Sequence, residues 1–272
     1  MTNAHVSANE AIKTPQFWCL WVALFCNVTA GIGILEQAAP MIQDFFRDSP
    51  MAVTATAAAG FVGLLSLCNM AGRFGWSSAS DYIGRKNVYY VFLVIGIVLF
   101  LLLAFTGGSA VWLFIVVTGI LISFYGGGFA TAPAYLRDLF GTYQVGAIHG
   151  RLLTAWSAAG VAGPLIINGV LDAQGEPGTL HAGAYRPALL TMAAVLLVGL
   201  IGNVLIRAVN AKHHVDPAKV PSAATTEKEA AAHHVKTAGG VRFPAWLAWL
   251  IVGIPLAYGI YQTFLNALKL FS

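Results

Sequence analysis

Residues 88–105 read VYYVFLVIGIVLFLLLAF, an apolar run without a charged side chain. The hydrocarbon core of a bilayer is about 30 Å thick, and a helix of about 20 apolar residues crosses it. Similar runs recur along the 272-residue chain, of which 58% is hydrophobic and 10% charged, with a mean hydropathy of +0.73. Soluble domains carry about 25% charged residues. The sequence therefore predicts an all-α integral membrane protein.

Apolar length and turn-forming joints divide the chain into seven candidate spans. These are residues 17–39, 53–76, 88–105, 110–132, 145–171, 187–209 and 243–268. The polar stretch 211–241 contains two prolines and reads as a solvated linker. We expect four parts: a cytoplasmic N-terminal segment (1–16), a six-helix unit (17–210), a cytoplasmic linker (211–241) and a single appended transmembrane helix (242–272).

The lysines and arginines set the expected orientation. If the N-terminus is cytoplasmic, twelve of the 15 basic residues fall on the cytoplasmic side, and only Arg47, Arg186 and Lys269 lie outside. Basic loops are retained in the cytoplasm, so this bias predicts a multi-pass protein of the inner (plasma) membrane. The pI of about 9.0 is then a signal of topology, and we expect no nucleic-acid partner.

Metal and enzyme sites are not expected. Cys19, Cys26 and Cys68 lie in apolar blocks without a CxxC pattern. The pairs His213-His214 and His233-His234 lack a cysteine or carboxylate set that would complete a metal site. A nucleophile–base motif of an intramembrane enzyme is also missing from the sequence. We therefore predict no cofactor, no metal and no enzymatic activity.

The stretch GRFGWSSASDYIGRK (72–86) follows the second span. Gly84 permits a tight turn. Asp81 can form ion pairs with Arg85 and Lys86 that hold the helix ends together and that can break when the helices move. The alternative is an ordinary basic loop on the cytoplasmic side.

This loop resembles the signature of the major facilitator superfamily, G-x-x-x-D-x-x-G-R-K/R, with Ser77 in place of the leading glycine. Several blocks also resemble the oxalate/formate antiporter family within it: TPQFW (14–18), GR (72–73), SFYGGG (123–128), PAY (133–135) and GRLLTAW (150–156). The resemblance covers about residues 12–210 and implies the C-terminal six-helix half of a twelve-helix carrier. FPAWL (243–247) resembles the start of a small helix appended to some members.

A six-helix half implies a partner. An isolated half would expose its cavity face to lipid, so we expect either an N-terminal six-helix half or a second copy of this chain to cover it. The same resemblance implies transport by alternating access, with the substrate bound near the membrane midplane between the two halves.

Arg73 lies inside the second span, about 12 Å deeper than Asp81 at 1.5 Å per residue. An arginine there usually faces a cavity or a partner, and its planar fork suits a carboxylate. The alternative is a side chain that snorkels to the interface. The family resemblance favours the anion site, because oxalate/formate antiporters hold their substrate with a matching arginine.

The same resemblance bears on Trp156, which stands where oxalate carriers of the family have a lysine. One cation in place of two favours a monocarboxylate such as formate or pyruvate over dianionic oxalate. Trp156 either contacts the substrate or fills the core, and we group it with Tyr125 and Arg73 as candidate substrate-binding residues.

Small residues in the fourth and fifth spans are candidates for helix packing or for gating. The set comprises Gly126, Gly127, Gly128, Gly160, Gly163 and Pro164. Glu36, near the outer end of the first span, is either a proton carrier or an interfacial acid.

The function expected from these features is secondary transport of a small carboxylate by one half of a carrier, by antiport or proton symport. The alternative hypothesis is a non-transporting membrane subunit for assembly or regulation, with the appended helix as its docking element.

Overall fold

The computed structural model describes residues 5–216, apart from residues 49, 51 and 176–179, together with residue 220 and five residues between 253 and 261. The chain divides into two compact units, Met1–His214 and Val215–Ser272. The first unit holds the fold described below. The predicted linker and appended helix fall almost entirely outside the described residues.

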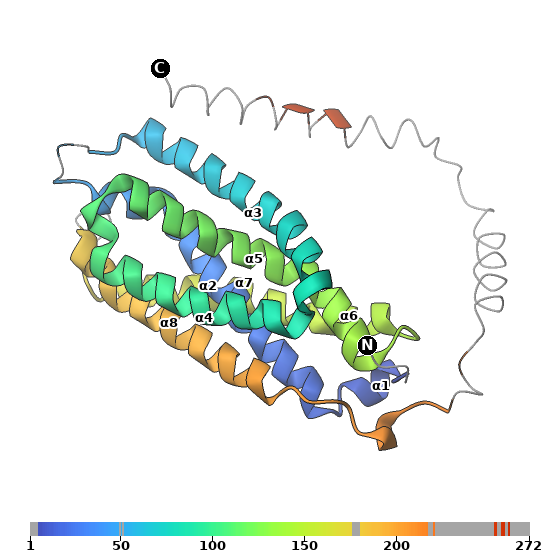
Figure 1. Ribbon diagram of the computed structural model, residues 1–272. Helices are drawn as coiled ribbons and strands as arrows, with labels where there is room; N and C mark the ends of the chain where they lie inside the picture. Colours follow the sequence, from blue (N-terminus) through green and yellow to red (C-terminus); the bar gives the residue numbers. More distant parts are fainter. Residues whose placement is uncertain are drawn as a thin grey trace. The chain divides into compact units, whose positions relative to one another are not determined.

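The first unit is built from helices (Figure 1). They are α1 (Ala8–Ala11), α2 (Pro15–Phe45), α3 (Ala55–Ile83), α4 (Arg85–Thr106), α5 (Val111–Phe140), α6 (Val145–Leu152), α7 (Thr154–Asp172) and α8 (Ala182–Leu205), with short 3-10 turns η1 (Gly107–Ser109) and η2 (Ala211–His213). Among the residues that the structure describes, six segments are long and apolar enough to cross a membrane, α6 and α7 counting as one, Val145–Asp172. The six predicted spans of this unit are confirmed.

Local sequence explains where the helices begin. The side chain of Thr14 accepts a hydrogen bond from the backbone N–H of Phe17 and so caps α2, and Pro15 occupies the first helical position. Thr54 caps α3 in the same way through the N–H of Ala57. Both caps satisfy N–H groups that the helix leaves without a partner.

The segment after the second predicted span is not an extended loop. α3 continues to Ile83, seven residues past the predicted end, because the serines of residues 77–80 are compatible with a helix. Asp81 therefore lies in the last turn of α3, and Gly84 alone separates α3 from α4. Gly84 has φ +86°, a conformation that side chains other than glycine rarely adopt.

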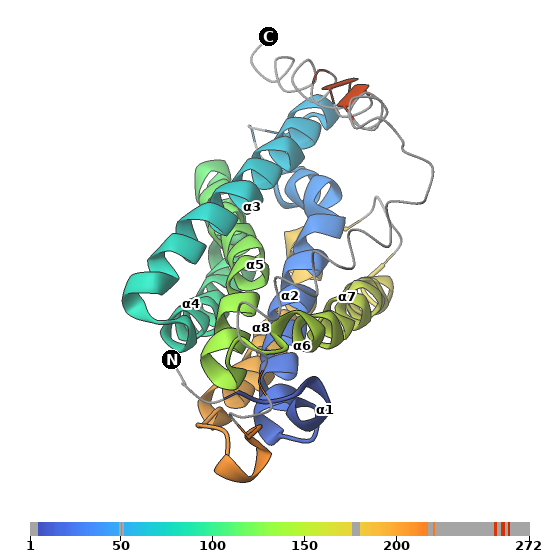
Figure 2. The same cartoon turned by 90° about the vertical axis from the view of Figure 1, so that its right-hand side faces the viewer.

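α2 lies at the centre of the unit and packs against α8, α7, α5 and α3. α3 packs chiefly along α5, and α4 along α8. Figure 2 shows α3 and α7 on opposite sides of α2 and α5. On these two flanking helices, large apolar side chains such as Phe74 and Leu165 are exposed in the described unit. They are available for lipid or for a protein partner.

One end of the unit gathers its basic residues. We call it the basic end: it comprises the start of α2, the α3–α4 junction, the end of α5, α6 and the segment after α8, with Lys13, Arg85, Lys86, Arg137, Arg151, Arg207 and Lys212. The N-terminal segment is fastened there: the N–H of Val6 donates to the carbonyl of Phe140 (2.9 Å), and Arg151 donates to the carbonyl of Ala8.

We expect the attachment of the N-terminal segment to the basic end to depend on pH through the carboxyl group of Glu10. The carboxylate of Glu10 accepts hydrogen bonds from Lys13 (2.7 Å) and from Nδ1 of His213 (3.0 Å), and these lower the pKa of Glu10 from its ordinary 4.5. A lowered carboxyl pKa gives stabilisation that is present above the ordinary value and is lost as the pH falls through the lowered one. We expect the amide protection of residues 6–11, measured by hydrogen exchange and corrected for intrinsic rates, to fall when the pH drops below 4.5. The Glu10→Gln variant serves as the reference, and protection equal to wild type in that variant at neutral pH would contradict the assignment.

Candidate functional site

The three candidate substrate-binding residues come together from three helices. The guanidinium carbon of Arg73 on α3 lies 5.5 Å from the ring centre of Phe129 on α5. Phe129 packs edge-on against Trp156 of α7 at 4.6 Å, and Tyr125 of α5 lies 5.3 Å from Trp156. Phe129 was not predicted from the sequence, although it lies one helical turn after Tyr125. We call Arg73, Tyr125, Phe129 and Trp156 the arginine–aromatic cluster.

The side chain of Arg73 does not reach toward the basic end. Its Nε–H donates to Oδ1 of Asn69 (3.3 Å), one turn farther from that end, and the guanidinium lies beside the Phe129 ring. Arg73 is exposed and pairs with no carboxylate among the residues that the structure describes. The guanidinium thus lies on an exposed side of the unit, beside α5.

The aromatic wall of the cluster depends on a glycine beneath it. A Cβ at Gly31 of α2 would lie 2.6 Å from Cβ of Tyr125, closer than side chains approach one another. α7 is tied to α2 by Trp21, whose indole N–H donates to the hydroxyl of Thr154 (2.9 Å). Trp156 is only partly buried, so it borders the cluster and is not sealed in the core.

The three consecutive glycines of α5 face different neighbours. A Cβ at Gly126 would meet the backbone of Asn69 on α3. One at Gly127 would lie 2.7 Å from Cβ of Trp76, and one at Gly128 would meet the amide of Asn27 on α2. Each glycine lets a different group approach α5, which is the packing role of small residues in membrane helices.

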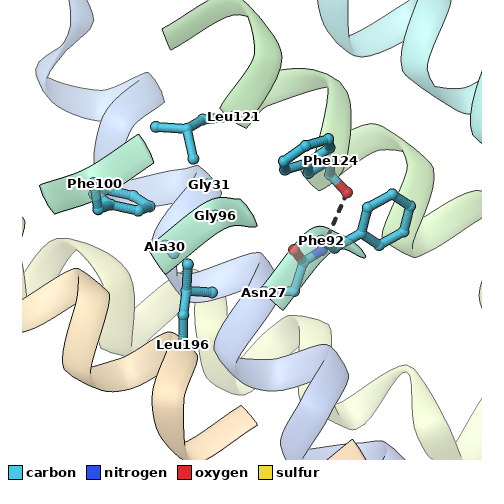
Figure 3. A pocket seen from close by; sticks show the side chains of 9 residues that line it. All are labelled: Asn27, Ala30, Gly31, Phe92, Gly96, Phe100, Leu121, Phe124 and Leu196. Carbon is cyan, nitrogen blue, oxygen red and sulfur yellow. Dashed lines mark hydrogen bonds between the residues drawn. The ribbon is translucent and has the colours of Figure 1, made fainter. Parts of the chain in front are cut away.

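Asn27 also borders a small interior cavity. Its amide N–H donates to the backbone carbonyl of Phe124 at 3.2 Å (Figure 3). The adjoining cavity has a volume of about 10 Å³ and is lined mostly by apolar groups, among them Gly31, Phe92 and Leu121. That volume holds about one water molecule, so a carboxylate substrate does not fit there.

The small residues of α7 divide into two kinds. A Cβ at Gly163 would lie 3.2 Å from the carbonyl oxygen of Thr29, so Gly163 supports the packing of α7 on α2. Gly160 is exposed, and a Cβ there would meet no described atom within 4 Å. Pro164 lies inside α7 and is partly buried.

The signature residues join the ends of four helices, α3, α4, α5 and α8. Arg85 pairs with Asp81 across the Gly84 turn, and its Nε lies 3.7 Å from Oδ2 of Asp138 on α5. Lys86 donates to the carbonyl of Ile206 (2.6 Å), just beyond the end of α8. Asp138 was not predicted, because nothing in its local sequence shows that the end of α5 meets the α3–α4 junction.

Comparison with known proteins agrees with this architecture. The family model described as Major Facilitator Superfamily matches residues 53–272, more than half of the chain. The chain belongs to the major facilitator superfamily. It is 30% identical over 166 residues to the oxalate:formate antiporter of Oxalobacter formigenes, a match that covers 60% of this chain and 38% of the antiporter. This similarity supports the resemblance to the oxalate/formate antiporter family.

A second relative in the superfamily is the uncharacterized transporter YhjX of Escherichia coli (strain K12). It is 26% identical over 132 residues, which cover 48% of this chain and 31% of that protein. The chain thus spans about a third of the length of each of these relatives.

In this superfamily member, Glu36 belongs to a polar chain between α2 and α7. Asn168 donates to Oε1 of Glu36 (2.9 Å), and its own Oδ1 accepts from Gln37 (2.6 Å). Glu36 is exposed. The carboxylate is therefore both accessible to solvent or partner and fixed in position by an amide from the neighbouring helix.

The candidate metal ligands do not assemble within the described residues, where no group of three or more suitable side chains occurs. His213 contacts Glu10, and His214 forms a backbone bridge with Val6. His233 and His234 lie outside the described residues. The three cysteines carry free thiols.

Proposed function

We propose that this chain takes part in the secondary transport of a small organic anion of the formate, oxalate or pyruvate class, with Arg73 as the partner of the substrate carboxylate. One observation carries the proposal. Arg73 lies inside a span, is exposed and has no carboxylate partner among the described residues. Its guanidinium lies beside the ring of Phe129, which packs against Trp156 of a third helix.

Electrostatics favours an anion at this place. A charged arginine in a membrane span is costly unless it has a partner or faces water. A carboxylate that accepts two parallel hydrogen bonds from the guanidinium removes that cost and fixes the orientation of the substrate. The rings of Phe129 and Trp156 exclude water on one side, which strengthens the charge interaction.

The charge balance of the cluster supports a monocarboxylate as the preferred substrate. Arg73 is its only arginine or lysine, and Trp156 stands where the family's oxalate carriers have a lysine. A monocarboxylate neutralises one cation, whereas a dianion such as oxalate retains an unmatched charge in a poorly solvated site.

Alternating access supplies the transport step in this proposal. The cluster is open on one side, and a second six-helix half, or a second copy of this chain, closes it. Breaking and re-forming the contacts of Arg85 with Asp81 and Asp138 permits the helix ends to separate at the inner membrane's cytoplasmic side.

The direct test is counterflow in proteoliposomes loaded with unlabelled formate. The chain is reconstituted alone and together with a co-expressed N-terminal six-helix half of the relative from Oxalobacter formigenes, and uptake of labelled formate, pyruvate and oxalate is compared. We expect saturable exchange when the cavity is closed by a partner half or by self-assembly. Absence of exchange for all three anions in both preparations would overturn the proposal.

Trp156→Lys tests the charge argument. A second cation on the helix that borders the same cluster favours a dianion by roughly 1–2 kcal/mol at an effective dielectric between protein surface and water. We expect the uptake ratio of oxalate to formate to rise about tenfold, since 1.4 kcal/mol corresponds to a factor of ten. Trp156→Phe is the matched control for loss of the indole. An equal change in both variants would contradict the charge argument.

Glu36 is proposed as the carrier of a coupled proton. Replacing it by glutamine keeps a hydrogen-bond acceptor for Asn168 but removes the ionisable group. We expect Glu36→Gln to retain formate counterflow while uptake no longer responds to an imposed pH gradient. Asn168→Asp, which alters the same contact without removing Glu36, is the comparison. Unchanged gradient-driven uptake in Glu36→Gln would remove the proton role.

A further inference from the structure

A second charged site lies at the basic end of the unit, separate from the arginine–aromatic cluster. A cleft of about 480 Å³ opens between the α3–α4 junction, the end of α5 and the segment after α8. Its lining residues are Gly84, Arg85, Lys86, Asn87, Tyr135, Asp138, Leu139, Ile206, Arg207 and Ala208. A cleft of this size has room for a phosphate group and part of whatever carries it.

The charge of this cleft is positive. Arg85, Lys86 and Arg207 line it, and Asp138 is the only acidic residue of the lining. Arg207 is exposed and forms no hydrogen bond or ion pair with a residue that the structure describes. Lys86 donates to the neutral carbonyl of Ile206, so its charge is not matched there. Asp138 and Asp81 are the carboxylates paired with Arg85, which leaves Lys86 and Arg207 uncompensated.

Arg85 adds a buried donor. The residue is 8% exposed, and its Nε–H has no hydrogen-bond acceptor among the described residues, since the nearest carboxylate oxygen of Asp138 is 3.7 Å away. A buried guanidinium N–H without an acceptor is unfavourable. An anion in the cleft supplies acceptor oxygens beside the same guanidinium.

The start of α4 is a further feature that favours an anion in this cleft. Its N-cap is Gly84, which has no side chain to satisfy the first N–H groups of this 22-residue helix. These groups and the positive end of the helix dipole attract an anion, and phosphate is a frequent ligand at such positions. The uncapped helix start and the three cationic side chains converge on one cleft.

We propose that this cleft binds a phosphate group, supplied either by the headgroup of an anionic phospholipid or by free phosphate. The location suits a lipid, because the cleft lies at the ends of the candidate membrane spans α4, α5 and α8. Lys86 lies 5.9 Å from the ring of Tyr90, and aromatic and basic residues of this kind are typical of the headgroup level. An occupied cleft places the phosphate beside Arg85, where it competes with Asp138 for the guanidinium.

The experiment uses the purified full chain in detergent and counts retained lipids by native mass spectrometry. The probes are dioleoylphosphatidylglycerol and, as the neutral-headgroup control, dioleoylphosphatidylcholine, each titrated separately. Inorganic phosphate is tested by the shift of the thermal unfolding temperature and as a competitor of the bound lipid. Retention of phosphatidylglycerol with competition by phosphate supports a lipid source, and a thermal shift with phosphate alone supports free phosphate.

Arg207→Gln is the informative variant, because the side chain of Arg207 forms no hydrogen bond or ion pair with a described residue. One basic residue near an anionic headgroup contributes about 1 kcal/mol, so we expect affinity for the bound probe to fall about fivefold. Arg186→Gln, which removes an exposed cation at the opposite end of α8, is the matched control and leaves affinity unchanged. Equal retention of both lipids without a phosphate effect, or equal behaviour of the two variants, would overturn the proposal.

Discussion

Arg73→Ala is expected to lower the rate of carboxylate counterflow at least about 30-fold, the largest effect of any single side chain in this unit. The estimate follows from the loss of a hydrogen-bonded charge partner that becomes buried once a second half closes the cavity, which costs about 2–5 kcal/mol. Each 1.4 kcal/mol corresponds to a tenfold change in affinity, so the lower bound already removes most binding. The measurement is initial uptake of labelled formate into proteoliposomes in which the substrate cavity is closed by a second half.

Arg73→Lys separates charge from geometry. Lysine keeps the positive charge but lacks the planar fork that binds both oxygens of a carboxylate, so it does not restore wild-type transport. We expect an intermediate rate, about tenfold below wild type, if one of two charge-assisted hydrogen bonds is lost. A lysine variant with the wild-type rate would show that only charge matters at this position.

Arg186→Ala is the control for a general effect of removing an arginine. Arg186 also lies over an aromatic ring, 4.3 Å from the centre of Phe105, and is exposed. Its position at the start of α8 places it at the end of the unit opposite the basic end. We expect uptake within about twofold of wild type, since surface substitutions usually change stability by less than 0.5 kcal/mol. Equal losses in the alanine variants of Arg73 and Arg186 would contradict a substrate role for Arg73.

The helices were predictable because their signal is local. A run such as residues 88–105 contains in its own composition the information that it spans a bilayer, and the structure has a helix there from Arg85 to Thr106. The residues at which the helices end were less predictable. Residues 77–80 are polar enough to suggest a loop, yet serines near an interface are compatible with helix, and Gly84 alone turns the chain.

The composition of the candidate site was only partly predictable. Arg73, Tyr125 and Trp156 stand out as residue types, one a charge in a span and the others large aromatics beside small residues. Phe129 and Asp138 do not stand out, because their importance comes from neighbours on other helices. A single sequence does not show which faces of two distant helices meet.

The three consecutive glycines of α5 also show that a single sequence does not reveal the neighbours of a residue. The sequence left packing and gating open for Gly126, Gly127 and Gly128, since small residues serve both. The structure distinguishes the three by their neighbours, which are the backbone of Asn69, the side chain of Trp76 and the amide of Asn27. Each of the three therefore has a packing neighbour in this structure, and a role in gating stays a prediction.

Gly72→Ala is expected to destabilise the unit by about 2–3 kcal/mol, at the upper part of the range for overpacked cores. A Cβ at Gly72 would lie 2.7 Å from the Cα of Ser123, and backbone cannot move aside as the tip of a side chain can. Gly126 faces the backbone of Asn69 from the other side of the same crossing. Either alanine must push α3 away from α5, the helix along which α3 chiefly packs.

Gly75→Ala is the matched control on the same helix. A Cβ at Gly75 would meet no described atom within 4 Å, so only the intrinsic preference of alanine for helix remains, worth about 0.5–1 kcal/mol in favour of folding. The two substitutions, three residues apart in α3, thus have opposite expected signs. Thermal unfolding in detergent measures both, with a lower midpoint for Gly72→Ala and an equal or higher one for Gly75→Ala. If the two midpoints shift together, the α3–α5 crossing is not as close as described, and Arg73, the next residue after Gly72, need not lie beside Phe129.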